Sequence, residues 1–160
     1  MDRLDRKILR LLQEDSTLAV ADVAKKVGLS TTPCWRRIQK LEEEGVIQRR
    51  VAVLDPIRVN TRVNVFVSIR TGSHSLEWLR RFSEVVQEFP EVVEFYRMSG
   101  DVDYLIRVVV PDIDAYDKFY KKLISRIELP NVSSAFAMEQ IKYTTALPLH
   151  YADAATKAEA

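Results

Sequence analysis

The sequence is poor in the residues from which several classes of active site are built. Its 160 residues contain one cysteine and two histidines, and neither histidine has a cysteine or carboxylate at metal-ligand spacing. The four glycines form no glycine-rich phosphate loop. We therefore expect no catalytic residue, no metal and no cofactor. Cys34 is interpreted as core filler, with a redox sensor as the lesser alternative.

Long apolar runs are missing too. No stretch approaches the roughly 18 apolar residues of a membrane-spanning helix, and the opening MDRLDRK lacks the apolar region of a signal peptide. A single cysteine cannot form an internal disulfide, which is typical of a reducing compartment. We expect a cytoplasmic protein that makes no contact with a membrane.

Charge is divided unevenly along the chain, although its net value is only +1. Residues 1–60 hold 12 Lys/Arg and 9 Asp/Glu, a net of +3, whereas residues 61–160 hold 12 and 14, a net of −2. The stretch Lys25–Arg50 carries a net of +4. This mild asymmetry does not by itself identify a nucleic-acid-binding protein. A dimer would double the basic surface available to phosphates.

The stretch Leu18–Gly45 predicts two helices joined by a short turn, the geometry that places a helix in the major groove of DNA. The apolar spacing within Val20–Val27 gives one face of the first helix, and Gly28 supplies a left-handed residue to end it. Ser30 or Thr31 is positioned to cap the second helix, and Pro33 fits its first turn.

The second of these helices has an apolar side and a polar, basic side. Cys34, Ile38 and Leu41 are spaced to face a core, with Trp35 packing at its edge. The residues that point the other way are Thr32, Arg36, Gln39 and Lys40. A preceding helix over Met1–Asp15 is expected to complete a three-helix core. Its apolar stripe consists of Leu4, Ile8, Leu11 and Leu12.

After a basic, extended segment over Val46–Leu54 and a hinge around Asp55–Thr61, the chain changes to the order β-α-β-β-α-β. The expected strands are Val63–Arg70, Val92–Met98, Tyr104–Val110 and Val132–Tyr143, and the expected helices are Ser75–Phe89 and a helix that begins at Pro111–Asp112. The buried stripe of that last helix is expected to hold Ile113, Tyr116, Tyr120, Leu123 and Ile127. Tyr104–Val110 is apolar on both faces, so we expect a second copy of the chain to cover the face that the helices leave open.

Two motifs resemble one family. GLSTTPCWRRIQKLEEEGVI is similar to the recognition region of the Lrp/AsnC family of bacterial and archaeal regulators, and SGDVDYLIRV is similar to its effector loop. The resemblance implies an α+β fold: an N-terminal winged helix-turn-helix domain and a C-terminal ferredoxin-like βαββαβ ligand-binding (RAM) domain. The expected domains are 1–60 with the hinge, 61–150 for effector binding and oligomerisation, and a flexible tail over 151–160.

The function that the resemblance implies is a sequence-specific transcriptional regulator. It would bind double-stranded DNA and respond to a free amino acid held between dimers of an octamer. The candidate DNA-binding residues are Ser30, Thr31, Thr32, Pro33, Arg36, Arg37 and Lys40. Two alternatives stay open, namely a nucleoid-structuring DNA-binding protein and a small-molecule enzyme on a ferredoxin-like fold.

The effector site is carried over from the family by position. The matching residues are Gly100, Asp101, Asp103, Tyr104, Ile113, Ala135, Phe136 and Ala137. From spacing alone, the loop 98–104 also fits an ordinary hairpin turn. TTPCW and SSAFAMEQIKYTT are similar to the subgroup linked to cysteine detoxification. Cysteine is therefore the first effector candidate, with leucine and methionine as alternatives.

Overall fold

The structure, a computed structural model, describes residues 1–72 and 75–152. Its contacts divide the chain into two units, one of Met1–Ala52 together with the residues from Lys142 onward and one of Val53–Ile141. The chain therefore passes between the units twice, whereas the expected domains of 1–60 and 61–150 require a single passage. From residue 153 on, the expected flexible tail lies outside the described residues. None of the described helices is long and apolar enough to cross a membrane.

The first unit contains three helices: α1 (Arg3–Glu14), α2 (Val20–Val27) and α3 (Thr31–Glu43). Asp2 and Asp5 form a capping box at the start of α1. Gly28 ends α2 with a φ of 79°, as predicted. Ser30 is the N-cap of α3, but its side chain accepts no capping hydrogen bond. We call this unit, with residues 142–152, the head.

The core of the head is built as the spacing of α2 and α3 predicts. Its buried members are Ile8, Leu9, Val23, Ala24, Val27, Cys34, Ile38 and Leu41. Leu9 was not part of the expected stripe, while Leu11 and Leu12 are only partly buried. A short 3-10 helix, η1 (Leu149–Tyr151), brings Leu149 against the same core. The last described residues therefore contribute to the folded head.

The stretch after α3 is extended but forms no strand within the described chain. The Ile47 N–H donates to the Leu41 carbonyl at 2.9 Å, and the Val51 and Leu54 side chains are exposed. The expected hinge at 55–61 is a hydrogen-bonded turn, because the Thr61 N–H donates to the Pro56 carbonyl at 2.8 Å.

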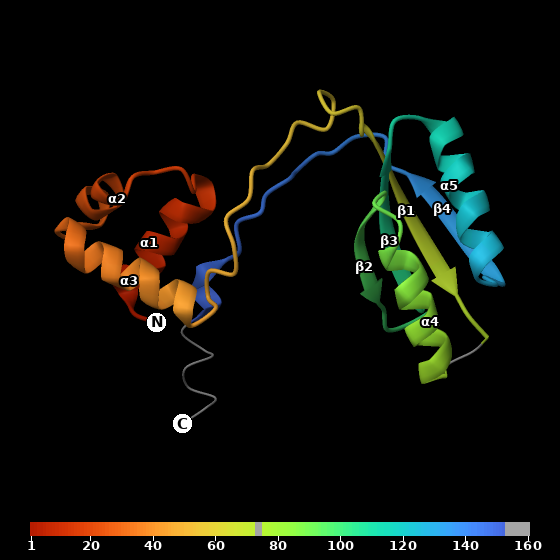
Figure 1. Ribbon diagram of the computed structural model, residues 1–160, viewed down its shortest axis with the longest axis horizontal. Helices are drawn as coiled ribbons and strands as arrows, with labels where there is room; N and C mark the ends of the chain where they lie inside the picture. Colours follow the sequence, from red (N-terminus) through yellow and green to blue (C-terminus); the bar gives the residue numbers. More distant parts are fainter. Residues whose placement is uncertain (73–74, 153–160) are drawn as a thin grey trace. The chain divides into compact units, whose positions relative to one another are not determined.

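The second unit has the predicted order β-α-β-β-α-β (Figure 1). Its elements are β1 (Val63–Arg70), α4 (Leu76–Gln87), β2 (Val92–Arg97), β3 (Tyr104–Val110), α5 (Ile113–Arg126) and β4 (Asn131–Phe136). The strands form one antiparallel sheet in the order β2-β3-β1-β4. Alternate residues of β1 and β3 are buried, and they pack with Phe82 of α4 and Phe119 of α5. Both helices therefore cover the same face of the sheet.

Two details of this unit differ from the sequence prediction. Ile113 was expected on the buried stripe of α5, but it is the first helical residue and is 67% exposed, while Phe119 fills the core. The last strand ends at Phe136 and not at Tyr143. Its partner β1 begins at Val63, so 138–143 meets no strand within the unit.

The face of the sheet opposite the helices mixes apolar and polar side chains. Phe66 and Tyr96 are exposed there, while Leu105 and Val109 are half-buried. At its centre, the Arg107 guanidinium donates to Glu94 at 2.8 Å and to Asn64 at 2.9 Å. Within the described unit no helix covers this face.

Candidate DNA interface and effector loop

Helix α3 separates a buried side from an exposed side as the sequence predicts. Cys34, Ile38 and Leu41 are buried in the core of the head, whereas Thr32, Arg36 and Lys40 are exposed. Burial raises the pKa of the Cys34 thiol, which disfavours the reactive thiolate. This supports the interpretation of Cys34 as core filler.

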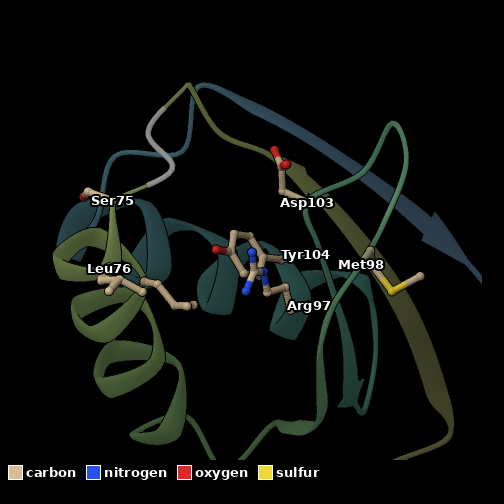
Figure 2. Close-up of a pocket in the computed structure, with 7 residues that line it drawn as sticks. Ser75, Leu76, Arg97, Met98, Asp103 and Tyr104 are labelled. Carbon is tan, nitrogen blue, oxygen red and sulfur yellow. The ribbon is translucent and has the colours of Figure 1, made fainter.

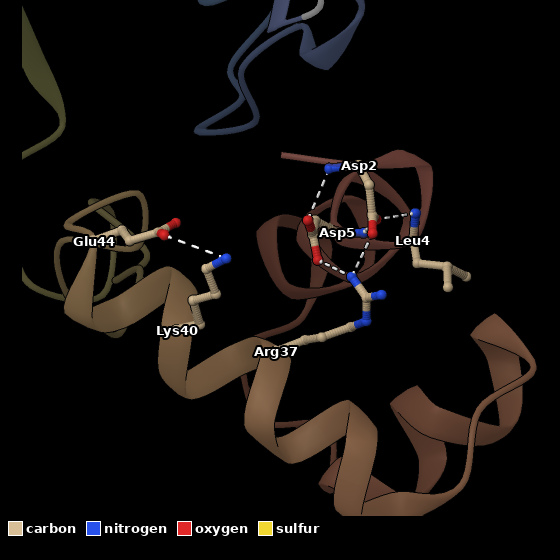
Figure 3. Close-up of polar contacts among 6 residues, drawn as sticks. All are labelled: Asp2, Leu4, Asp5, Arg37, Lys40 and Glu44. Atoms are coloured by element: carbon tan, nitrogen blue, oxygen red, sulfur yellow. Dashed lines mark hydrogen bonds and ion pairs between the residues drawn. The ribbon is translucent and has the colours of Figure 1, made fainter. Parts of the chain in front are cut away.

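The basic residues of α3 have different surroundings. Arg36 is exposed and has no hydrogen-bond or ion-pair partner among the described residues. Lys40 lies 3.6 Å from Glu44, and the Lys40 side chain is 71% exposed (Figure 3). Both cations remain accessible to a phosphate or a base edge.

Arg37 is partly exposed and reaches the start of α1. Its Nη1 donates to the Asp2 carboxylate at 2.6 Å and to the Asp5 carboxylate at 2.7 Å (Figure 3). A hydrogen bond from the Asp5 backbone N–H, followed by the bond from Arg37, lowers the pKa of Asp2 to about 2. The geometry gives Arg37 an intramolecular task, which is to hold α3 against the start of α1.

The N-terminal end of α3 is open to solvent. Thr31 and Pro33 are exposed, and the Ser30 side chain makes no cap hydrogen bond that would occupy it. The first backbone N–H groups of a helix attract anions such as phosphates. Trp35, which we expected to pack at the edge of the core, is half exposed. The surface at this end therefore combines polar groups with an aromatic ring.

The loop between β2 and β3 is closed by Asp103. The Asp103 carboxylate accepts a hydrogen bond from the Thr71 N–H at 2.8 Å. Its backbone N–H donates to the Ile69 carbonyl at 3.0 Å, and its carbonyl accepts from Met98 at 2.8 Å. Gly100 has a φ of 101°, a conformation that strains any residue with a Cβ. This geometry shows that Asp103 holds the loop, as an aspartate does in an ordinary hairpin turn.

A small pocket of about 90 Å³ lies beside this loop (Figure 2). It is lined by Ser75, Leu76, Leu79, Arg97, Met98, Asp103 and Tyr104. Arg97 was absent from the predicted site, although a basic residue directly before a candidate binding loop is a signal that could have identified it. The Tyr104 ring is buried and packs against Trp78 and Phe82, with centroids 5.6 Å and 5.4 Å away.

The remaining predicted effector residues lie at the other end of the sheet. Phe136 pairs with Val65 of β1, whereas Tyr104 pairs with Ile69. Four residues of a strand span about 13 Å. Ile113 comes after the end of β3 that is remote from Tyr104. One chain therefore does not bring Gly100, Asp101, Asp103 and Tyr104 together with Ile113, Ala135, Phe136 and Ala137.

No group of three or more His, Cys, Asp or Glu residues within the described chain is arranged to hold a metal ion. His74, one of the two histidines considered above as metal ligands, lies outside the described residues.

Comparison with known proteins identifies both units. Residues 1–48 match the model of a winged helix-turn-helix DNA-binding domain, and residues 64–147 match the model of the Lrp/AsnC ligand binding domain. The DNA-binding transcriptional activator DecR of Escherichia coli is 51% identical over 150 residues, which cover 93% of this chain and 99% of DecR. Its name makes no reference to cysteine, so the subgroup linked to cysteine detoxification gains no support from it.

Two solved structures match nearly the whole chain. An AsnC family transcriptional regulator from Agrobacterium tumefaciens is 83% identical with a TM-score of 0.92, covering 94% of this chain and 99% of that one. The regulator NMB0573 from Neisseria meningitidis, solved as a complex with L-Met, is 31% identical with a TM-score of 0.90. That match covers 95% of this chain and 99% of the other.

Proposed function

Since the chain belongs to the Lrp/AsnC family of transcriptional regulators, we propose that it reads specific DNA sites with α3 and that an amino acid bound at subunit boundaries controls this reading. The family places a DNA-binding domain and a ligand-binding domain on one chain. It also excludes the enzyme alternative, because the relatives are named as transcriptional regulators. The DNA-contacting residues, the effector and the assembly are the finer parts of the proposal.

The exposed face of α3 carries the DNA part of the proposal. Thr32, Arg36 and Lys40 are exposed on one side of a helix whose other side is fixed in the core. Arg36 is the first choice for a base contact, because its guanidinium is not occupied within the described chain. Ser30, Thr31 and Pro33 would approach the DNA at the N-terminal end of the helix, and Arg37 would orient α3 without contacting DNA.

The test compares Arg36→Ala with the parent on a specific duplex and on a random duplex, at two salt concentrations. A base contact predicts a loss of about 1–3 kcal/mol that is confined to the specific duplex. A phosphate contact predicts an equal loss on both duplexes and a shallower salt dependence. Arg80→Ala, a change of a similarly exposed arginine in the other unit, is the matched control. Unchanged binding of Arg36→Ala to both duplexes would remove Arg36 from the interface.

The separation of the effector residues supports a site built from more than one subunit. The loop group with Asp103 and the group with Phe136 lie at opposite ends of one sheet, so a single ligand can touch both only if they come from different chains. We propose a homodimer as the minimum unit and an octamer as the effector-responsive assembly. A ligand at such a boundary favours one assembly over another, and that difference shifts the equilibrium.

The ligand class that fits is a free amino acid with an uncharged side chain. The Gly100–Asp101 amides would face its carboxylate, Asp103 would hold the loop or receive the ammonium group, and Phe136 with Ile113 would shape the side-chain pocket. The methionine complex of the Neisseria relative favours methionine among the candidates. Cysteine is a candidate effector because of the sequence resemblance, and leucine is the third candidate.

Calorimetry with methionine, cysteine and leucine tests this part. Asp103→Ala should fold and bind DNA but lose the response to the amino acid. Asp114→Ala removes an exposed carboxylate from α5 and serves as the control. If no amino acid binds the parent, or if Asp103→Ala responds as the parent does, the effector site is wrong and the DNA part still stands.

The nucleoid-structuring alternative needs the same fold and the same basic helix. Footprinting distinguishes it from regulation. Discrete protected sites support the regulator, whereas even coating of the DNA supports the structural role.

A further inference from the structure

The segment that leaves the ligand-binding unit after β4 ends on the head. Beyond Phe136 the chain forms no ladder in the described residues, and from Lys142 onward its contacts lie with the head. The Gln13 side chain of α1 accepts a hydrogen bond from the Leu147 N–H at 2.7 Å and donates one to the Leu147 carbonyl at 3.3 Å. Two residues later, Leu149 packs against the core of the head.

The two hydrogen bonds of Gln13 fix one residue of the segment in position. A primary amide that binds both the N–H and the carbonyl of one residue replaces the pairing that a neighbouring strand would give. It therefore specifies which residue of the segment lies against α1. Leu149 adds an apolar contact on the same segment, and the Ala146 N–H donates to the Thr144 hydroxyl at 3.1 Å just before it. We call residues 142–149 the return segment.

We infer that Gln13 is a positioning residue that couples the ligand-binding unit to the DNA-binding head through the return segment. This inference rests on the proposed function, because it assigns a route to the effector response. Phe136, in the predicted effector site, and Leu147, held by Gln13, are eleven residues apart. Fully extended, that stretch spans at most about 40 Å. The end of β4 and the attachment on α1 are therefore joined by a tether no longer than this limit.

The other passage between the units is attached to α3 just before Ala52, where the Arg50 guanidinium donates to the Glu42 carboxylate at 2.9 Å. Beyond Ala52, residues 53–61 form only local hydrogen bonds within the described chain. Its residues Val51 and Leu54 are exposed, and a turn at 55–61 interrupts it. A turn closed by local hydrogen bonds can reorient without breaking contacts to the head. Of the two passages, the return segment is the one that follows β4, on which Phe136 of the proposed effector site lies. We call the two Gln13–Leu147 hydrogen bonds that hold this segment the clamp.

The experiment uses the full chain and Gln13→Ala, with Gln87→Ala as the control, because Gln87 is an exposed glutamine of α4. The DNA dissociation constant is measured without ligand and with saturating methionine, cysteine or leucine, and calorimetry gives the amino-acid affinity. We define the coupling ratio as the ratio of the DNA dissociation constants measured without and with ligand. In allosteric proteins this ratio is typically about 5–150-fold. Leu149→Ala tests the same segment through its apolar contact.

The inference is supported by results from all three variants. Gln13→Ala binds DNA without ligand within about twofold of the parent, binds the amino acid as the parent does, and has a coupling ratio close to 1. Leu149→Ala lowers the ratio in the same direction, and Gln87→Ala keeps the ratio of the parent. A coupling ratio in Gln13→Ala equal to that of the parent overturns the inference. So does a loss of DNA binding without ligand, because Gln13 is then only a structural part of the head.

Hydrogen exchange at the Leu147 amide separates a failure here from a failure of the proposed function. Loss of the Gln13 acceptor is expected to speed that exchange about tenfold. If the parent binds none of the three amino acids while exchange accelerates, the effector assignment fails and the coupling fails with it, although the clamp stands. Unchanged exchange refutes the clamp itself, whatever the amino acids do.

Discussion

The Phe136 ring lies edge-on against the Tyr116 ring, with their centroids 5.2 Å apart and their planes at 79°. The Tyr116 hydroxyl also shares a hydrogen bond with the Ser134 hydroxyl on β4. Helix α5 therefore fixes both the end of the last strand and the aromatic ring proposed to shape the effector pocket. In the proposed effector site, selectivity would depend on how α5 packs against β4.

Phe136→Ala should change which amino acid is preferred. Because the ring is 39% exposed, its loss should destabilise the unit by about 1–2 kcal/mol, less than truncation of a buried phenylalanine. The space it leaves should shift the relative affinities toward larger side chains by about tenfold. Calorimetry with alanine, methionine and phenylalanine measures the shift. An unchanged order of affinities would place Phe136 outside the pocket.

Arg37→Ala should destabilise the head, whereas Arg36→Ala should not. The Arg37 guanidinium joins two carboxylates at the start of α1, and its removal leaves both without their cation. We expect a loss of about 1–2 kcal/mol, since the group is partly exposed and solvent screens it. For Arg36→Ala the change should stay within about 0.5 kcal/mol. Chemical denaturation of the two variants makes the comparison, and equal stabilities would contradict it.

The stability of the head should depend on pH through Asp2. Its pKa in the folded chain is about 2, below the ordinary value of 3.8. A lowered carboxyl pKa stabilises the folded state above the unfolded pKa, and this stabilisation is lost as pH falls from about 4 toward 2. Asp2→Asn should therefore be less stable than the parent at pH 7, and the difference should shrink below pH 4 and vanish only below pH 2. An NMR titration of the Asp2 carboxyl carbon gives the pKa directly, and a value near 4 would contradict the capping role.

The open face of the sheet should be the place where two copies meet. Leu105 is half-buried there beside Tyr96, and a charge at this position would have to be desolvated on association. Leu105→Lys should give a monomer at micromolar concentration by light scattering, while the parent is a dimer or larger. Ile124→Lys places the same charge on α5 of the helical side, where Ile124 is 43% exposed, and should leave the mass unchanged. A monomeric parent would refute the predicted assembly.

Local patterns predicted the elements well where a single unit supplies both faces of the packing. The spacing of Cys34, Ile38 and Leu41 placed α3 correctly because these side chains meet a core made by the same head. The alternation of apolar and polar residues along β1 predicted the strand correctly for the same reason. The prediction for Ile113 was wrong because a helical period does not say where the helix begins relative to the sheet that it covers. Ile113 is the first residue of α5, and its side chain is exposed there.

Long-range partners could not be deduced from local patterns. Nothing around Gln13 indicated that its amide would bind Leu147, because the two residues are 134 positions apart. The sequence of 137–143 is typical of a strand, but a strand needs a neighbour, and β1 offers none beyond Asn64. The candidate effector residues were found by resemblance, whereas their separation into two groups is a consequence of strand register.

The place of residues 142–152 in the head also sets the order in which this protein can be completed during its synthesis. A ribosome makes α1, α2 and α3 before the ligand-binding unit and the return segment after it. Until Leu147 has been made, Gln13 lacks its hydrogen-bond partner. Until Leu149 has been made, the core of the head lacks one of its apolar contacts. Domains that fold during synthesis usually do so from the N-terminus. Here the DNA-binding head is completed only after the ligand-binding unit has been made. A prematurely terminated chain therefore carries an incomplete head.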